Sequence, residues 1–308
     1  MKADFHVHSA FSVGGVLGKP HASESVEQIL ERAEQEGIKM LSISDHDNTL
    51  AYSYILNNPQ VLDKFSGRIV PAVEANVHYN GTNIHAMLYG FKLEDSERIN
   101  NLTPLVKARG ENLLKRQQER IEKLKRISDT LGIVYDKKFT ITQDGLCGHD
   151  SFCEHVLSKP ENVGKLSFSD MREFYYDNLL NEQSPWYLNF SEDLGSLQEL
   201  YDEVKKVDKN IIVSLCHIGQ YAIESRSQFI REVRPYIDAI EVMHWSHIRA
   251  LQEECCKLAD ELGLYKFGGS DFHTQEQKLG MWDNSKREIN TDSLRLPENI
   301  YNIHGKKI

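Results

Sequence analysis

Histidine or acidic residues stand at the end of nearly every stretch of this sequence that is predicted to form a β-strand. The first is His6-Val7-His8, in which alternation along a strand places both imidazoles on the same face. The residues at the corresponding ends of later strands are Asp45, His46, Glu74, His85, His217, Asp271 and His273. One His-x-His pair arises easily by chance among 13 histidines, whereas a series repeated from strand to strand does not. The series constrains the fold because it requires the strand ends to meet.

Seven segments have strand character, and helical segments separate most of them. They are residues 4–8, 39–44, 68–74, 83–90, 211–217, 237–242 and 264–271. Strands that alternate with helices favour a parallel sheet, and we expect this number of them to close into a barrel. In such barrels the active site is built at the C-terminal ends of the strands, where the histidines and carboxylates lie.

Strand character disappears between residues 92 and 210. Apolar residues recur at helical spacing from 94 to 132, and several short helices are predicted between 150 and 203. We therefore predict a discontinuous barrel domain made of residues 1–96 and 196–308. Residues 97–195 are predicted to form a helical insertion that covers the active site.

The types of side chain indicate metal chemistry. Imidazole and carboxylate ligands without thiolate suit Mn²⁺, Fe²⁺ or Zn²⁺. The set of candidate ligands exceeds one coordination sphere, so it predicts two or three divalent ions, with Glu74 and Asp271 as the natural bridges. Two ions roughly 3.5–4 Å apart can clamp a phosphate group and lower the pKa of a bound water.

Taken together, these motifs resemble the PHP (polymerase and histidinol phosphatase) family over residues 1–95 and 205–275. The matching segments are His6-Val7-His8, Ser44-Asp45-His46-Asp47, Pro71-Ala72-Val73-Glu74, Ile84-His85, Ser214-Leu215-Cys216-His217, Ile240-Glu241-Val242 and Gly269-Ser270-Asp271-Phe272-His273. The resemblance implies a distorted (β/α)7 TIM-like barrel with an inserted helical subdomain. It also implies a di- or trinuclear metal centre, most often with manganese and alternatively with zinc or iron, and phosphate-ester hydrolysis by a metal-bound hydroxide.

The resemblance also implies roles for individual residues. The metal ligands by motif position are His6, His8, His46, Glu74, His85, His217, Asp271 and His273. Asp45 would be a catalytic carboxylate that orients a ligand or handles a proton. His247 would contact the substrate phosphate and take part in catalysis, and His149 in the insertion would bind substrate.

Two motifs depart from the subgroup of the family that carries a helical insertion. Ser12-Val13-Gly14 replaces Ser-Asp-Gly, and because valine cannot ligate, the third metal is expected to be absent, weaker or held by His21. Gly148-His149-Asp150-Ser151 replaces Gly-Arg-x-His and lacks the arginine, which argues against specificity for nucleotide bisphosphates.

Composition narrows the classes of partner. A net charge of −10 disfavours binding to nucleic acid or anionic membranes through a basic surface. There is no apolar run of 18 residues and no signal-peptide pattern, and the five cysteines show no Cys-x-x-Cys spacing. We expect a cytoplasmic protein with a small phosphorylated substrate, no membrane association and no stable nucleic-acid partner. The oligomeric state is left open.

Three functions agree with these observations. The first is a metal-dependent phosphoesterase that acts on a small phosphorylated metabolite or nucleotide. The second is an exonuclease that trims short RNA or DNA ends by the same chemistry, which the acidic composition disfavours. The third is a degenerate PHP module that binds metal or ligand without catalysis, which the intact Glu74 and Asp271 disfavour.

Overall fold

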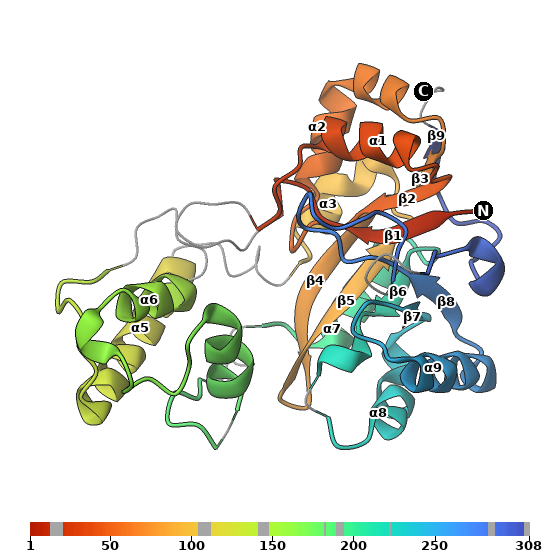
Figure 1. Cartoon of the computed structure of the whole chain (residues 1–308). Coiled ribbons are helices and arrows are strands. Elements are labelled where there is room, and N and C mark those ends of the chain that lie inside the picture. The colour runs from red at the N-terminus through yellow and green to blue at the C-terminus, as the bar shows by residue number, and fades with distance from the viewer. Residues whose placement is uncertain are drawn as a thin grey trace. The chain divides into compact units, whose positions relative to one another are not determined.

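The computed structural model describes residues 1–12, 21–103, 112–140, 148–181, 183–188, 194–221, 223–282 and 287–304. The chain divides into two compact units (Figure 1). The first unit takes its described residues from the ranges 1–13, 21–107 and 194–308, and the second from the range 108–193.

The described strands of the first unit form two sheets. One has the order β1-β2-β3-β9 and the other β4-β5-β6-β7-β8. The strands are β1 (Ala3–Val7), β2 (Met40–Ile43), β3 (Arg68–Ile69), β4 (Ala72–Tyr79), β5 (Thr82–Tyr89), β6 (Ile212–Leu215), β7 (Ala239–Met243), β8 (Tyr265–Gly268) and β9 (Ile303–His304). The β3–β9, β4–β5 and β5–β6 pairs are antiparallel, and the other pairs are parallel. The structure confirms a mixed α/β fold. It differs from the single, parallel, closed sheet that the sequence suggested, because the described strands form two sheets and three of their pairs are antiparallel.

Pro71 separates two strands where the sequence pattern predicted one over residues 68–74. Proline has no backbone N–H for a sheet ladder, so β3 ends at Ile69 and β4 begins at Ala72 in the other sheet. β4 and β5 form a hairpin through Asn80 and Gly81, which have φ angles of 47° and 82°. Positive φ at both positions is what this type of tight turn requires, and Asn and Gly are the residues that accept it most readily.

Helices cover the sheets of the first unit. The α-helices are α1 (Val26–Gln35), α2 (Leu50–Asn57), α3 (Ser96–Asn100), α7 (Leu197–Val207), α8 (Arg226–Val233) and α9 (Arg249–Leu262). The 3-10 helices are η1 (Pro59–Lys64), η2 (Leu93–Asp95), η6 (Ile218–Gln220), η7 (Arg234–Tyr236) and η8 (Thr291–Ser293). Ser25 begins α1 with a reciprocal hydrogen-bonded cap to Gln28, and Gly263 ends α9 in the left-handed conformation. Their buried faces, such as Ile29 and Leu30 of α1, join one core with Val7 of β1.

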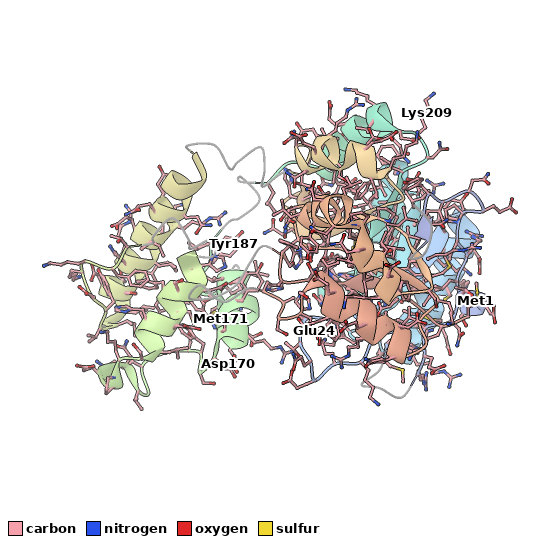
Figure 2. All side chains as sticks on the ribbon, turned by 90° about the horizontal axis from the view of Figure 1, so that it is seen from above. Met1, Glu24, Asp170, Met171, Tyr187 and Lys209 are labelled. Atoms are coloured by element: carbon pink, nitrogen blue, oxygen red, sulfur yellow. The ribbon has the colours of Figure 1, made fainter. Side chains whose placement is uncertain are left out.

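The second unit is helical in its described residues. It contains α5 (Asn112–Leu131), α6 (Gly148–Leu157), η3 (Pro160–Asn162) and a π-helical turn, η4 (Glu173–Leu179). Ile121, Leu124, Phe152, Phe174 and Trp186 are buried in a separate apolar core. Asp170, Met171 and Tyr187 mark this unit in Figure 2. The second unit is therefore stabilised by a hydrophobic core of its own.

Two further observations concern membrane-spanning helices and cysteine pairing. No helix in the described ranges is both long and apolar enough to span a membrane. The cysteines of the described ranges, Cys153, Cys216, Cys255 and Cys256, are unpaired, and Cys147 lies outside those ranges.

Candidate metal centre

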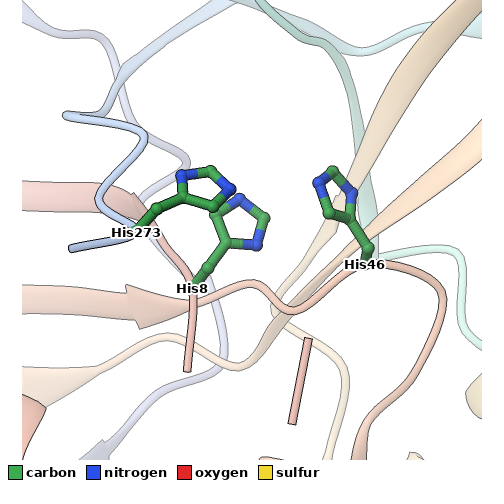
Figure 3. Close-up of side chains that lie close together, drawn as sticks. All are labelled: His8, His46 and His273. Carbon is green, nitrogen blue, oxygen red and sulfur yellow. The ribbon is translucent and has the colours of Figure 1, made fainter. Parts of the chain in front are cut away.

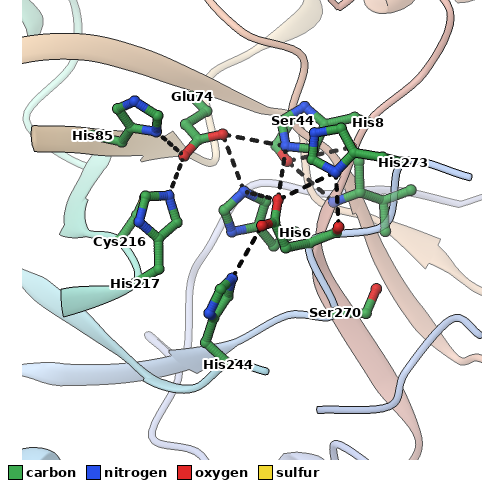
Figure 4. Close-up of polar contacts among 12 residues, drawn as sticks. His6, His8, Ser44, Glu74, His85, Cys216, His217, His244, Ser270 and His273 are labelled. Carbon is green, nitrogen blue, oxygen red and sulfur yellow. Dashed lines mark hydrogen bonds and ion pairs between the residues drawn. The ribbon is translucent and has the colours of Figure 1, made fainter. Parts of the chain in front are cut away.

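The carboxylate of Glu74 is fully buried on β4 and is surrounded by imidazoles (Figure 4). Its Oε1 atom lies 2.7 Å from His85 Nδ1 and 2.8 Å from His217 Nε2. Its Oε2 atom lies 3.1 Å from His6 Nε2, 3.2 Å from His8 Nε2 and 3.1 Å from His46 Nδ1. Apart from the neighbouring His6 and His8, the rings come from residues far apart in the sequence. A carboxylate with nitrogen donors on both oxygens has the form of a bridging metal ligand.

Strand ends and one hairpin bring these residues together. His6 lies in β1 and His8 just after it, His46 follows β2, and His217 follows β6. In the β4–β5 hairpin Asn76 pairs with His85, which places His85 on the same face as Glu74. Two isolated parallel bridges, His46 to Glu74 and Val7 to Phe272, connect the sheets at this point.

The segment after β8 approaches β1 closely because of one glycine. A Cβ on Gly269 would lie 2.0 Å from His6 Cβ, so a larger residue cannot fit. The buried Asp4 carboxylate then fastens the segment by accepting hydrogen bonds from Ser270 N at 3.0 Å and Ser270 Oγ at 2.6 Å. This places Asp271 at the metal centre.

Asp271 is the second carboxylate at the centre of the cluster. Its Oδ1 atom lies 3.4 Å from both His6 Nε2 and His8 Nε2. Its Oδ2 atom lies 3.2 Å from His244 Nε2 and accepts a hydrogen bond from the Trp245 indole at 3.1 Å. All eight ligands predicted from the sequence thus lie in one cluster, with His273 Nδ1 3.5 Å from Asp271 Oδ1.

Several imidazole nitrogens have no hydrogen-bond partner within the described structure. His8 Nε2, His46 Nδ1 and His273 Nε2 are buried and make no well-aligned hydrogen bond, although the first two lie 3.2 and 3.1 Å from Glu74 Oε2. The three residues offer ligand atoms within 4.8 Å of one another (Figure 3). His273 Nδ1–H donates to the carbonyl of Asp271 at 2.8 Å, which leaves the lone pair on Nε2. Buried unbonded nitrogens are costly unless something binds them. The donor set therefore fits a divalent transition metal.

The charges within the cluster support the same assignment. Burial would raise the pKa of Glu74, but His6, His46 and His85 outweigh it and hold that pKa well below its ordinary value. Burial would lower the pKa of His6, but the carboxylates of Glu74, Glu241 and Asp271 raise it well above its ordinary value. Burial, with nearby imidazoles adding, lowers the pKa of His46 far below its ordinary value. The carboxylates are therefore ionised and His46 is neutral, the forms in which these side chains ligate metals, whereas His6 has to release a proton before it can ligate.

Glu241 and His244 belong to the cluster, although neither was among the ligands predicted from the sequence. Glu241 Oε1 lies 3.0 Å from His6 Nδ1, and its Oε2 accepts a hydrogen bond from the backbone N–H of His217 at 2.8 Å. Burial would raise the pKa of Glu241, but His6 and His244 lower it to about 2. A charged residue inside the apolar run Ile240-Glu241-Val242 was a signal of this role. His244, three residues before the predicted His247, is the histidine of this segment that contacts Asp271.

Asp45 and His247 lie close to the cluster with different contacts. The buried Asp45 carboxylate accepts hydrogen bonds from Ser9 N at 2.6 Å and Ser9 Oγ at 2.7 Å, and burial raises its pKa to about 6. His247 Nδ1–H donates to the Val242 carbonyl at 3.2 Å, and its Nε2 has no hydrogen-bond partner among the residues that the structure describes. Burial, with His244 adding, lowers the pKa of His247 to about 4.

His149 belongs to the second unit. It lies on α6, with Nε2 3.4 Å from Asp150 Oδ1 and its ring stacked on Tyr175 at 5.8 Å between centroids. Its role in substrate binding stays a prediction. Val13, on which the sequence argument about a third metal rests, lies outside the described residues.

Two solved structures share this fold over almost their whole length. The chain is similar to an amidohydrolase from Chromobacterium violaceum whose structure holds sulfate and no metal, with a TM-score of 0.60, 19% identity, and 91% of this chain and 90% of that chain covered. It is also similar to a protein from Bifidobacterium adolescentis that is named as a metal-dependent phosphoesterase of inferred function, with a TM-score of 0.59, 18% identity, and 94% and 93% covered. At these identities the likeness shows a common fold alone.

A weaker likeness is to a two-domain protein from Bacteroides vulgatus whose name describes one part as a predicted PHP-like metal-dependent phosphoesterase. Its TM-score is 0.40 and its identity 12%, with 89% of this chain and 52% of that chain covered. No protein-family model matches the sequence, and no curated protein matches it.

Proposed function

We propose that this protein is a metal-dependent phosphoesterase that hydrolyses a small phosphorylated metabolite or nucleotide. The observation that carries the proposal is the Glu74 carboxylate, which has imidazole nitrogens within 3.2 Å on both of its oxygens and Asp271 across the same cluster. The name of the Bifidobacterium adolescentis protein and the sulfate held by the Chromobacterium violaceum protein agree with a site for phosphate esters.

The residues that would hold two or three divalent ions are those that converge on the two carboxylates. They are His6, His8, His46, Glu74, His85, His217, Asp271 and His273. When bound, such ions neutralise phosphate charge and lower the pKa of a water near them. Manganese is the ion we propose first, with zinc and iron as the alternatives.

Neighbouring residues would orient the ligands and serve the substrate. Glu241 holds the His6 ring through Nδ1, so that Nε2 faces Glu74 and Asp271. Asp45, with a pKa raised to about 6 by burial, is the group we propose to hold or move a proton. His247, whose buried Nε2 has no hydrogen-bond partner in the described structure, is the candidate for contact with the phosphate.

The two sheets also support a finer description of the fold. One bridge connects Val7 of β1 to Phe272, just after β8, and the other connects His46, just after β2, to Glu74 of β4. Each bridge joins one sheet to the other. We propose that the strands are parts of one distorted (β/α)7 barrel.

The test is a screen of the purified protein after removal of metal with a chelator. Mn²⁺, Zn²⁺ or Fe²⁺ is added back, and phosphate release is measured over phosphomonoesters and cyclic phosphodiesters, with bound metal measured in parallel. Turnover that depends on added metal is the expected result. Absence of turnover on every phosphate ester tested overturns the proposal.

The same screen separates the alternatives. Release of mononucleotides from a labelled oligonucleotide favours the exonuclease, and tight metal binding without any turnover favours the non-catalytic module. Amide substrates are included because the Chromobacterium violaceum protein is named an amidohydrolase.

A further inference from the structure

Trp245 is the exposed tryptophan among the three of this chain. Its exposed fraction is 48%, whereas those of Trp186 and Trp282 are 1% and 5%. The indole N–H donates a hydrogen bond to Asp271 Oδ2 at 3.1 Å, and the ring centroid lies 5.4 Å from that of His244. Trp245 thus combines a polar edge that is bonded to the metal centre with a large apolar ring in contact with water.

Trp245 lies on the solvent-accessible side of the metal centre. The side chains of His6, His8 and Glu74 have no exposed surface. The ligands that keep exposed surface are His85 with 27%, His273 with 19%, Asp271 with 13% and His46 with 12%. A substrate reaches the centre from the side of these four residues, and Trp245 is bonded to one of them. The indole therefore borders the entrance to the centre.

The segment that carries Trp245 is held in place by its own contacts. The N–H of His247 donates to the His244 carbonyl at 2.9 Å, and the N–H of Ser246 donates to His244 Nδ1 at 3.1 Å. A Cβ on Gly219 would lie 2.8 Å from the Ser246 carbonyl oxygen, so the segment packs directly on the backbone after β6. The indole is therefore positioned before a ligand binds, which lowers the entropic cost of stacking on it.

We infer that Trp245 is a stacking platform for the substrate, and that the phosphate ester cleaved at the centre carries a planar aromatic ring in its leaving group, as an aryl group or as a nucleobase. The N–H lies in the plane of the indole, so its bond to Asp271 occupies an edge and leaves a ring face for stacking. The inference rests on the proposed function and deepens it by naming a class of leaving group and the residue that selects it.

The first test measures selectivity in the metal-loaded wild type, in Trp245→Phe and in Trp245→Leu. The substrates are phenyl phosphate, a nucleoside monophosphate and glycerol phosphate, which has no ring. Both variants lose the bond to Asp271, which affects all three esters alike, but only the leucine variant loses the aromatic ring. The control is Leu56→Ala, which removes an apolar side chain of similar exposure, 47%, from α2 in the same unit. Circular dichroism checks that the variants fold.

The expected result is a change in relative kcat/KM. In Trp245→Leu, the kcat/KM of at least one ring-bearing ester relative to glycerol phosphate should fall roughly 10-fold, because stacking on an aromatic side chain is lost. Trp245→Phe should keep most of the wild-type preference, and Leu56→Ala should keep all of it. Intrinsic differences between the leaving groups cancel, because the same esters are compared across variants. The ester with the larger fall shows whether the ring is aryl or nucleobase.

The second test measures binding without turnover. Phenylphosphonate and methylphosphonate have P–C bonds that resist hydrolysis and differ in the ring. Phenylphosphonate should change the tryptophan fluorescence of the metal-loaded wild type but not of Trp245→Phe, because the two other tryptophans are buried. It should also bind the wild type roughly 10-fold more tightly than methylphosphonate does, and this ratio should fall in Trp245→Leu.

Two outcomes overturn the inference in distinguishable ways. If the wild type hydrolyses phosphate esters, but Trp245→Leu changes kcat/KM equally for all three substrates and phenylphosphonate leaves the fluorescence unchanged, only the inference falls. If the wild type hydrolyses no phosphate ester, the proposed function falls and the inference falls with it.

Discussion

The substitution Glu241→Gln tests how the protein orients its first histidine. When His6 ligates through Nε2, both partners of Glu241 are donors, namely His6 Nδ1–H at 3.0 Å and the N–H of His217 at 2.8 Å. Glutamine has one acceptor oxygen and an amide NH₂ that cannot accept. One donor must therefore face the NH₂ group, or His6 must move its proton to Nε2, the atom that faces Glu74 and Asp271.

The size of the effect follows from the bond that is lost. Glu241 is buried, and hydrogen bonds to a charged group in such a place contribute about 1.5–3 kcal/mol. At about 1.4 kcal/mol for each factor of ten, metal affinity should fall roughly 10- to 100-fold. Groups that orient metal-bound histidines have effects of the same order.

The measurement is competition between metal-free protein and a fluorescent chelator for added metal, followed by the rate of hydrolysis at saturating metal. Glu254→Gln is the matched control, because it removes the same charge from an exposed position of α9 in the same unit. Thermal unfolding confirms that both variants are folded. If Glu241→Gln binds metal as tightly as the wild type and the control, Glu241 does not orient His6, and the argument about its tautomer is wrong.

Three further predictions concern the metal cluster, a buried carboxylate and the second unit. His8→Ala and Asp271→Ala should each abolish hydrolysis and lower bound metal, measured by elemental analysis, and unchanged values in both would refute the site. Burial raises the pKa of Asp45 from 3.8 to about 6, so the metal-free protein should lose about 3 kcal/mol of stability as the pH rises from about 4 through 6. Denaturant titrations across that range should show a flatter profile for Asp45→Asn, and a profile identical to wild type would exclude Asp45 as the titrating group. Phe152→Ala should cost the second unit about 3–5 kcal/mol, seen by calorimetry as a lower unfolding temperature of one transition, and no change would contradict a separate core.

The sequence by itself determined the local features of this protein. Alternation along β1 was enough to place His6 and His8 on one face. Asn80-Gly81 is a local signal for the β4–β5 turn because only a few residues accept positive φ at both positions. The choice of imidazole and carboxylate, without thiolate, already limited the metals that the chain can hold.

Only the tertiary structure decided which of these residues meet. Pro71 ended β3 and moved Glu74 into the second sheet, where the carboxylate became the centre of five imidazoles. Glu241 reached His6 only because β7 and β8 lie in the order that brings the segment after β8 against β1. Such contacts depend on the pairing of strands that are far apart in the sequence, and periodicity, capping and turn signals carry information only about neighbours along the chain.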